Sequence, residues 1–454
     1  RFYSLYFNAN YVYDSRYSLS ASWRLDKTDL FGADPKFRGR PLWSVGASWN
    51  AHNESFIRDI TWIDALKPRV SYGLTGNIDS SVSSYLTGEI KYNDFISDNY
   101  ASLKNPPNDQ LRWEKTQTWN AGIDFSFLGY RVSGSFDYYH KRGSDLLCST
   151  DVDPTNGVTS VVINNGVCLN HGFELQLNGH ILEARNRDQF GINAYLNLSF
   201  NKNEIIYVNK APSGGFDALM YGRLHKGYPI SGLFSYDYAG LEVVDGMQYV
   251  MWRDHEGQKQ NSSVTNDSFT VQDIVYSGTL DPKFVGTFTP EFTWKGFSLS
   301  GMFAYYGGHV MRVNTDDMTA EGSMNGYGFT TNIQAFPSSY LNYWRTGDVS
   351  KYFGNGYASE NIIGAADLYS KYGNNNVVPA DYLKLRNIVL GYTFPEQLTR
   401  RIGINEARLR VQMTNVATWA RNNAGKDPEA VNAFDGTNRN KAPRSYTFSL
   451  FLNF

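Results

Sequence analysis

A two-residue rhythm of apolar and polar side chains runs along nearly the whole chain, and no other feature constrains the fold as strongly. In the segment RYSLSASWRL, residues 16–25, serines and Arg24 alternate with a set of apolar side chains: Tyr17, Leu19, Ala21, Trp23 and Leu25. Alternation over about ten positions is the pattern of a β-strand with one face in apolar surroundings and the other in water. The pattern predicts an all-β fold.

The sequence contains thirteen such runs. They lie near residues 2–12, 16–25, 42–51, 66–74, 115–127, 130–140, 170–179, 189–201, 284–295, 297–305, 381–394, 407–415 and 444–454. The polar face of the run at 407–415 carries Arg408, Arg410 and Gln412, where a soluble β-sandwich needs core side chains. We therefore expect one face of every strand to be apolar and the other to line a wet lumen.

The connections between the runs alternate between short and long without a break. Short connections are Asp14-Ser15, a stretch near 52–65, Leu128-Gly129, 180–188, Lys295-Gly296 and 395–405, and long ones are about 26–41, 75–114, 141–169, 202–283, 308–380 and 418–443. A meander of this kind is the sequence pattern of a transmembrane antiparallel β-barrel, with short periplasmic turns and long extracellular loops. The last strand follows a long loop, so Phe454 is expected at the periplasmic rim of a bacterial outer membrane.

Composition agrees with this interpretation. The chain contains 32 Tyr and 10 Trp, more aromatic side chains than a soluble sandwich or β-solenoid needs on its strands, although those architectures also alternate. No stretch approaches the run of about 18 apolar residues that a membrane-spanning helix requires. The formal net charge of -2 gives no electrostatic reason to expect a nucleic-acid partner.

The number of runs also predicts that the barrel is incomplete within these residues. Thirteen is odd, so the first and last strands run in the same direction, whereas a closed antiparallel barrel needs them to run in opposite directions. At least one strand is therefore expected before Arg1. On this argument residues 1–454 are the C-terminal portion of the barrel of a longer protein.

Six stretches, in chain order, carry more specific patterns: SRYSLSASWRLDKTDLFG (15–32), LKPRVSYGLTGN (66–77), LRWEKTQTWNAGIDFSFLGYRVSGSFDYYHKRGSDLL (111–147), KGYPISGLFSYDYAGL (226–241), DYLKLRNIVLGYTFP (381–395) and RLRVQMTNVATWA (408–420). Together they resemble the SusC family, the TonB-dependent outer-membrane transporters of Bacteroidetes. The stretch 111–147 is the most specific of them. The loop 308–380 has little recognisable motif, and Cys148 and Cys168 depart from the family pattern.

The resemblance implies a barrel of about 22 strands with a plugged lumen. It also implies a plug domain, a TonB box and a signal peptide upstream of Arg1, and a SusD-like surface lipoprotein as partner. The expected function is TonB-dependent import of a bulky nutrient, an oligosaccharide first and an oligopeptide as the alternative, with a dimer of transporter pairs as one arrangement. A passive porin or a structural surface barrel is the alternative from a different class.

The long loops are rich in Tyr, Trp, Asn and Asp, which offer flat apolar rings beside hydrogen-bonding groups, as sugar and peptide sites do. The candidate ligand-binding residues are Tyr236, Tyr238, Trp252, Tyr340, Tyr343 and Trp344. The alternative for each is packing within a loop or at the membrane interface. The sequence is compatible with both interpretations.

No pattern predicts catalysis, a metal site or a cofactor. Asp151 and Asp153 lie in a Pro-Asn-Gly stretch that predicts a turn, and the stretch lacks the twelve-residue calcium pattern. We therefore expect a protein that is not an enzyme.

The two cysteines, Cys148 and Cys168, could bridge within their loop or remain two partly buried free thiols. The last strand carries Tyr446, Phe448, Leu450, Leu452 and Phe454 on one face. It resembles the C-terminal strand by which assembly machinery recognises outer-membrane barrels.

Overall fold

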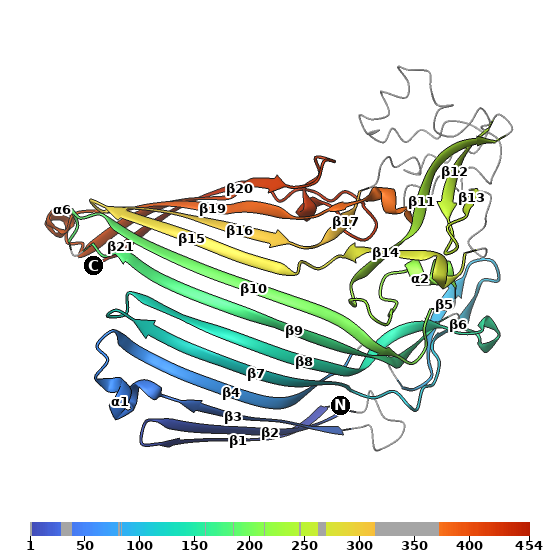
Figure 1. Ribbon diagram of the computed structural model, residues 1–454, viewed down its shortest axis with the longest axis horizontal. Coiled ribbons are helices and arrows are strands. Elements are labelled where there is room, and N and C mark those ends of the chain that lie inside the picture. The colour runs from blue at the N-terminus through green and yellow to red at the C-terminus, as the bar shows by residue number, and fades with distance from the viewer. Residues whose placement is uncertain are drawn as a thin grey trace.

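A computed structural model of the chain contains a large antiparallel sheet of 13 strands (Figure 1). The structure describes residues 2–28, 39–79, 82, 84–158, 160–184, 186–212, 214–244, 247–261, 269–313 and 372–454. The strands of this sheet are β1 (Phe2–Tyr13), β2 (Tyr17–Thr28), β3 (Gly39–Trp49), β4 (Ile63–Asn77), β7 (Glu114–Phe127), β8 (Val132–Asp151), β9 (Ser160–Leu182), β10 (Gly191–Val208), β15 (Phe284–Trp294), β16 (Phe297–Gly307), β19 (Tyr382–Thr393), β20 (Glu406–Ala420) and β21 (Ser445–Asn453). Each predicted run corresponds to one of these strands, so the all-β class and the number of strands are confirmed.

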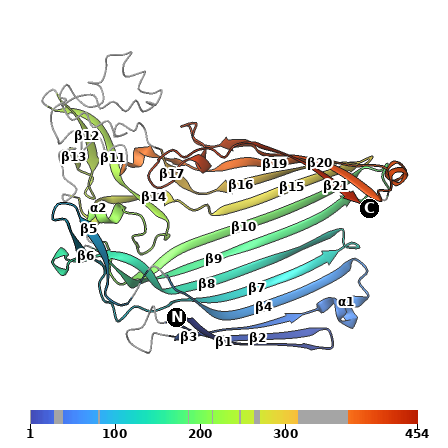
Figure 2. The same ribbon diagram turned by 180° about the vertical axis from the view of Figure 1, so that it is seen from behind.

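Each strand of the large sheet pairs with the sheet strands that precede and follow it in the chain. This holds even across the longest connections, because β10 pairs with β15 and β16 pairs with β19. The sheet curves into a trough whose two edges are β1 and β21 (Figures 1 and 2). Since all twelve pairings between the 13 strands are antiparallel, β1 and β21 run in the same direction, as the odd count predicted.

The short connections gather at one end of the trough and the long ones at the other, which we call the short-turn end and the long-loop end (Figure 1). Two of the short turns have positive φ at both central residues, 49° and 53° at Asp14 and Ser15, and 49° and 85° at Lys295 and Gly296. This backbone is that of a type I′ turn, whose twist matches the twist of paired strands. The predicted two-residue turn is confirmed at Lys295-Gly296. The first connection is one residue longer than predicted, 14–16, because Tyr13 pairs with Tyr17.

The two faces of the sheet differ as predicted. At the long-loop end, aromatic side chains from consecutive strands follow one another on one face, and we call this set the aromatic belt: Trp43, Tyr72, Trp119, Tyr138, Phe173, Phe200 and Phe284. Ring centroids within it lie 4.4 Å apart for Tyr72 and Trp119 and 4.9 Å apart for Phe200 and Phe284. A second aromatic group lies near the short-turn end, where the rings of Phe297 and Tyr392 are 4.5 Å apart. Two aromatic girdles on an apolar face are typical of a transmembrane barrel.

Three strands extend furthest beyond the runs that the sequence predicted. Residues 141–169 were expected as a loop, but β8 continues to Asp151 and β9 begins at Ser160, and the two pair along this length with register shifts near Leu146. In the same way β10 continues to Val208. Along residues 144–151 of β8 and 160–168 of β9 most side chains are at least partly buried on both faces, so the two-residue rhythm is lost although the strands continue.

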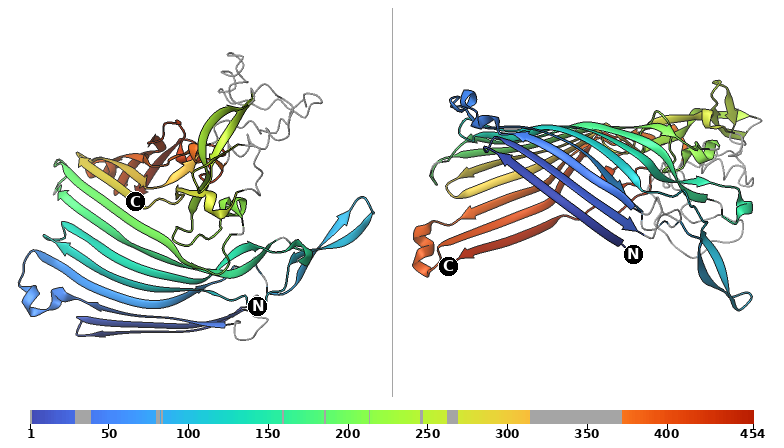
Figure 3. Two further views of the ribbon diagram at one scale, coloured as in Figure 1. Left: turned by 45° about the vertical axis from the view of Figure 1, so that its right-hand side comes forward. Right: turned by 90° about the horizontal axis from the view of Figure 1, so that it is seen from below.

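The long connections also contain strands that the sequence did not predict. A four-stranded sheet is formed by β11 (Gly232–Val244), β12 (Met247–Arg253), β13 (Lys259–Asn261) and β14 (Ile274–Thr279), and small pairs are formed by β5 (Thr87–Asn93) with β6 (Asp98–Asn105) and β17 (Val310–Arg312) with β18 (Val377–Pro379). The hairpin of β5 and β6 projects away from the trough (Figure 3). Among the described residues the α-helices are short: α1 (Ser55–Arg58), α2 (Gly215–Leu219) and α6 (Glu396–Thr399). In the part of the chain that the structure describes, no helix is long and apolar enough to cross a lipid bilayer.

Candidate functional site

The face of the sheet opposite the aromatic belt carries polar side chains and contains a shallow groove of about 230 Å³. Successive strands place these side chains in register, because Asp137 pairs with Glu174, and Gln176 pairs with Asn197, which pairs with Thr287. Carboxylate, amide and hydroxyl groups thus line the groove across β8, β9, β10 and β15. Such a surface can exchange hydrogen bonds with a hydroxyl-rich or amide-rich ligand.

An arginine holds two carboxylates on the wall beside this groove. Arg69 on β4 donates from Nη2 to Asp137 Oδ2 at 2.6 Å and from Nε to Asp124 Oδ1 at 3.1 Å. The guanidinium crosses over Gly122, where an added Cβ would lie only 2.5 Å from Asp137 Oδ1 and 2.9 Å from Arg69 Cζ. The glycine is needed here because a larger residue would displace the bridge between the strands.

The motif Trp113-Glu114-Lys115 at the start of β7 secures the long-loop end of the wall. Trp113 is buried, Glu114 accepts a hydrogen bond from the Leu147 backbone N–H at 2.8 Å, and Lys115 Nζ lies 2.6 Å from Asp145 Oδ2. These contacts give Trp113, Glu114 and Lys115, which belong to the family-like stretch 111–147, a structural role: they hold β7 against β8 where the strands leave the trough.

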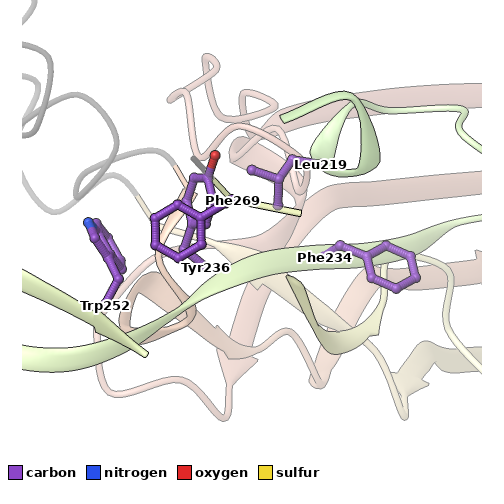
Figure 4. Packing of buried hydrophobic residues seen from close by; sticks show 5 residues of the cluster. All are labelled: Leu219, Phe234, Tyr236, Trp252 and Phe269. Carbon is purple, nitrogen blue, oxygen red and sulfur yellow. The ribbon is translucent and has the colours of Figure 1, made fainter. Parts of the chain in front are cut away.

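The described parts of the connections 209–283, 308–381 and 421–444 pack together at the long-loop end, and we call this unit the loop cap. Its largest hydrophobic cluster contains Tyr236 and Trp252, each only 1% exposed, with Leu219, Phe234 and Phe269 (Figure 4). Tyr238 is partly buried against the same cluster. Burial raises the pKa of Tyr236 to about 12.

Three predicted ligand-binding residues, Tyr236, Tyr238 and Trp252, therefore lie in or against the core of the loop cap. A ligand could reach Tyr236 and Trp252 only if the loop cap opened, because both side chains are buried. The structure favours the alternative of loop packing for these side chains. The other three predicted residues, Tyr340, Tyr343 and Trp344, lie outside the described residues.

Arg312 joins the parts of the loop cap and is 1% exposed. Its Nη2 donates to the carbonyl of Phe234 and, at 3.1 Å, to Ser235 Oγ. Its guanidinium carbon lies 5.4 Å from the ring centroid of Tyr372 and 5.8 Å from that of Phe434, within reach of cation–π attraction. Burial lowers the pKa of Arg312 to about 10, so the group keeps its charge at neutral pH.

Further contacts hold the cap to itself and to the sheet. Asn374 Nδ2 donates to Asp237 Oδ1 at 2.8 Å, which links the first two connections. Glu429, from the third, accepts hydrogen bonds from Lys384 and, at 3.0 Å each, from Tyr382 Oη and Arg386 Nη2 on β19. The cap is thus anchored to the trough by a carboxylate.

The sequence did not identify a pair of half-exposed tyrosines in the cap. Tyr228 is 39% exposed and Tyr276 is 37% exposed, and their ring centroids lie 4.9 Å apart. The pair lies close to β10, because Ile205 N–H donates to the Tyr228 carbonyl at 2.8 Å. Tyr228 belongs to the stretch 226–241, but the aromatic side chains of that stretch do not reveal from the sequence which of them stay exposed.

The bridge between Cys148 and Cys168 is not formed in the structure, which shows both thiols free. The register explains this, since Cys148 lies opposite Ile163 while Cys168 lies opposite Gly143, five positions away along β8. Cys168 is 4% exposed and accepts a hydrogen bond at Sγ from Asn203 Nδ2 at 2.9 Å.

We expect unreduced, denatured protein to contain two reactive thiols for each copy of residues 1–454, and native protein to react slowly at Cys168 because that side chain is buried. Titration with a thiol reagent before and after denaturation measures both quantities. A matched sample treated with reductant gives the total. Thiols that become available only after reduction would contradict the free-thiol structure.

Among the residues whose positions are described, no group of three or more His, Cys, Asp or Glu side chains could hold a metal ion.

Comparison with known proteins agrees with this architecture. Residues 1–314 match the family model described as TonB dependent receptor-like, beta-barrel. The chain is 28% identical to TonB-dependent receptor P39 of Formosa agariphila over 94% of its own length and 43% of that protein, and 26% identical to TonB-dependent receptor SusC of Bacteroides thetaiotaomicron over 98% and 42%. The fold is similar to that of the RagAB peptide transporter, with a TM-score of 0.73 and 24% identity over 100% of this chain and 48% of that one. The chain spans less than half the length of these relatives.

Proposed function

This chain belongs to the TonB dependent receptor-like β-barrel family, and from that premise we propose that it forms the C-terminal part of the barrel of an active importer, which carries a bulky nutrient across the outer membrane. The predicted fold class, an antiparallel transmembrane β-barrel, is confirmed by the family and by the 13-stranded sheet. The family is one of outer-membrane transporters and receptors rather than enzymes. The import function of the whole protein is our proposal.

The observation that carries the proposal is the contrast between the two faces of the sheet. The aromatic belt lies on a face with many exposed apolar side chains, and Arg69, Asp124 and Asp137 lie on the other. Ion pairs of this kind are costly in hydrocarbon but suit the polar interior of a barrel. The contrast supports a wall between lipid and a conduit.

In the proposed orientation the long-loop end faces the cell exterior and the short-turn end faces the periplasm, as in other outer-membrane barrels. The C-terminal residue Phe454, after β21, then lies at the periplasmic rim. We propose that the same-face residues of β21, together with the residue that follows it, form the recognition strand for barrel assembly: Tyr446, Phe448, Leu450, Leu452 and Phe454. They alternate with Thr447, Ser449 and Asn453, interrupted only by Phe451, and this pattern supports the role.

The proposed partners follow from the family. A SusD-like lipoprotein would cover the long-loop end, and TonB would act through a plug and a TonB box encoded upstream of residue 1. Two such transporter pairs would associate as a dimer. No cofactor is part of the proposal.

The proposed substrate is an oligosaccharide, with an oligopeptide as the second candidate. The groove beside Asp137 and Glu174 offers amides, hydroxyls and carboxylates, and the rings of Tyr228 and Tyr276 offer an apolar surface for a pyranose ring. Tyr340, Tyr343 and Trp344 remain proposed ligand contacts. Binding assays with neutral oligosaccharides and with peptides of similar size would separate the two substrate classes.

The test of the proposed function is the energy dependence of uptake by the full-length protein in cells. We expect uptake of the bound nutrient to fall to background when a protonophore collapses the proton gradient, because TonB transmits that gradient. A general porin in the same cells provides the control, since its passive flux of a small solute should continue. Uptake that survives collapse of the gradient would favour the passive porin and overturn the proposal.

A further inference from the structure

Three neighbouring strands carry basic side chains directly beyond the aromatic belt, on the same face of the sheet. Each basic residue is the next residue on the same face after a belt residue. His140 follows Tyr138 on β8, and Lys202 follows Phe200 on β10. On β9, which runs the other way, His171 precedes Phe173. His140 lies opposite His171, and His171 lies opposite Lys202, so the three side chains form one row across the sheet. Arg142 follows His140 at the next position on this face of β8.

The row, which we call the basic row, consists of His140, His171, Lys202 and Arg142. The two imidazole centroids are 6.4 Å apart, and the side chain of Lys202 is 53% exposed. Residues two apart on a strand are separated by about 7 Å. On β8, β9 and β10, His140, His171 and Lys202 therefore each stand about 7 Å beyond the belt residue of the same strand, in the direction of the long-loop end. His140 lies opposite Trp119 of the belt, and Arg142 stands one position further out on β8.

The position of the row determines what it can contact. Tyr and Trp of a barrel girdle lie at the level where hydrocarbon meets headgroups. Side chains one position further out, on the lipid-facing surface, therefore lie among the headgroups. Lys, Arg and His offer N–H donors with positive or titratable charge, which is the chemistry that binds phosphate oxygens.

We propose that the basic row binds the phosphate of an anionic lipid, a phosphorylated glycolipid of the outer leaflet. The choice of leaflet rests on the proposed orientation of the barrel, whereas the phosphate chemistry does not. The site would hold annular lipid against β8, β9 and β10 below the loop cap, and nothing in the import mechanism requires it.

One acidic residue competes with the lipid for the row. Glu204 follows Lys202 at the next position on the same face of β10, and its Oε2 lies 3.2 Å from Lys202 Nζ. A phosphate that reaches Lys202 must share its ammonium with this carboxylate. Neutralising Glu204 should therefore strengthen lipid binding, while neutralising Lys202 should weaken it.

The test uses the full-length protein in neutral detergent micelles, titrated with diphosphoryl lipid A while native mass spectrometry counts the bound lipids. Phosphatidylcholine serves as the zwitterionic lipid, and inorganic phosphate serves as the anion without acyl chains. We compare K202Q, R142Q and E204Q with K141Q. The last is a matched control, because Lys141 is exposed and adjacent on β8 but faces the other side of the sheet.

We expect K202Q and R142Q each to weaken lipid A binding about fivefold, because one Lys or Arg near an anionic membrane surface contributes about that factor to the binding constant. E204Q should strengthen binding by about the same factor, and K141Q should leave it unchanged. The gain expected for E204Q cannot arise from a folding defect. Equal effects of K202Q and K141Q, no gain for E204Q, or equal affinity for phosphatidylcholine would overturn the proposal. Full displacement by inorganic phosphate would instead show a plain anion site. None of these outcomes depends on whether the barrel transports.

Discussion

Replacing Glu429 by glutamine should detach the 421–444 segment of the loop cap from the sheet while the barrel strands stay paired. The carboxylate is the acceptor for Lys384, Arg386 and Tyr382, and Lys384 is only 4% exposed. A neutral amide would leave the Lys384 ammonium buried without a counter-charge. Breaking a buried ion pair in this way costs about 3–5 kcal/mol.

Hydrogen exchange measured by mass spectrometry checks this expectation. Peptides covering residues 421–444 should exchange much faster in E429Q than in the parent protein, and peptides of β19 should change little. Glu406→Gln is the control, since Glu406 pairs with Arg408 at an exposed site and such pairs contribute about 1 kcal/mol or less. Unchanged exchange in 421–444 would show that other contacts suffice to hold the segment.

Replacing Asp273 by asparagine should destabilise the four-stranded sheet of the loop cap and remove a pH dependence from it. Asp273 is 5% exposed and accepts hydrogen bonds from the backbone N–H and the ring of His255 and from the backbone N–H and hydroxyl of Thr270. Burial alone would raise the pKa of Asp273, but these hydrogen bonds outweigh it and lower the pKa from 3.8 to about 2. The shift corresponds to about 2–3 kcal/mol of stability at neutral pH.

The sign of the pH dependence follows from the two pKa shifts. The contribution of Asp273 is present above its ordinary pKa of 3.8 and is lost as the pH falls toward about 2. The hydrogen bond to Asp273 raises the pKa of His255, so that contribution is present below the ordinary pKa of histidine, 6.5, and is lost as the pH rises through the folded value. The cap should therefore be most stable at mildly acidic pH.

Fluorescence of Trp252, buried in the same cap, provides the measurement when spectra of Trp252→Phe are subtracted. Urea midpoints for the cap should fall on both sides of an optimum between about pH 4 and pH 6 in the parent protein. D273N should show a lower and flatter profile. Glu256→Gln, an exposed neighbour, is the control. The same steep profile in D273N would mean that other groups cause the pH dependence.

The strands of the sheet could be predicted because a wall between lipid and water imposes a two-residue period that survives in the sequence. The strand ends were predicted wrongly where the strands extend beyond this wall, because the two-residue period is lost there. Beyond His140, Arg142 and His171, β8 and β9 continue with most side chains at least partly buried on both faces, so residues 144–151 and 160–168 lose the rhythm and were assigned to a loop.

The candidate site could be predicted less well, because composition does not show which side of a loop packs inward. Tyr236 and Trp252 were candidates either for ligand contact or for loop packing, and the structure buries them, while Tyr228 and Tyr276 remain half exposed. The polar wall around Arg69 was predicted as a wet face, but its bridge to Asp124 and Asp137 depends on register between strands far apart in sequence. Register of that kind is fixed by pairing and is not visible in one sequence.

The loop cap has a consequence for how such proteins can diversify. Since β10 pairs directly with β15, and β16 with β19, whole connections can be exchanged by recombination without changing a hydrogen bond of the sheet. Arg312 and Asn374 restrict this freedom, because their partners lie on other connections of the cap. The three connections should therefore be exchanged together. In a chimera that receives only the connection 308–381, the buried Arg312 guanidinium would lack its partners on the other two connections.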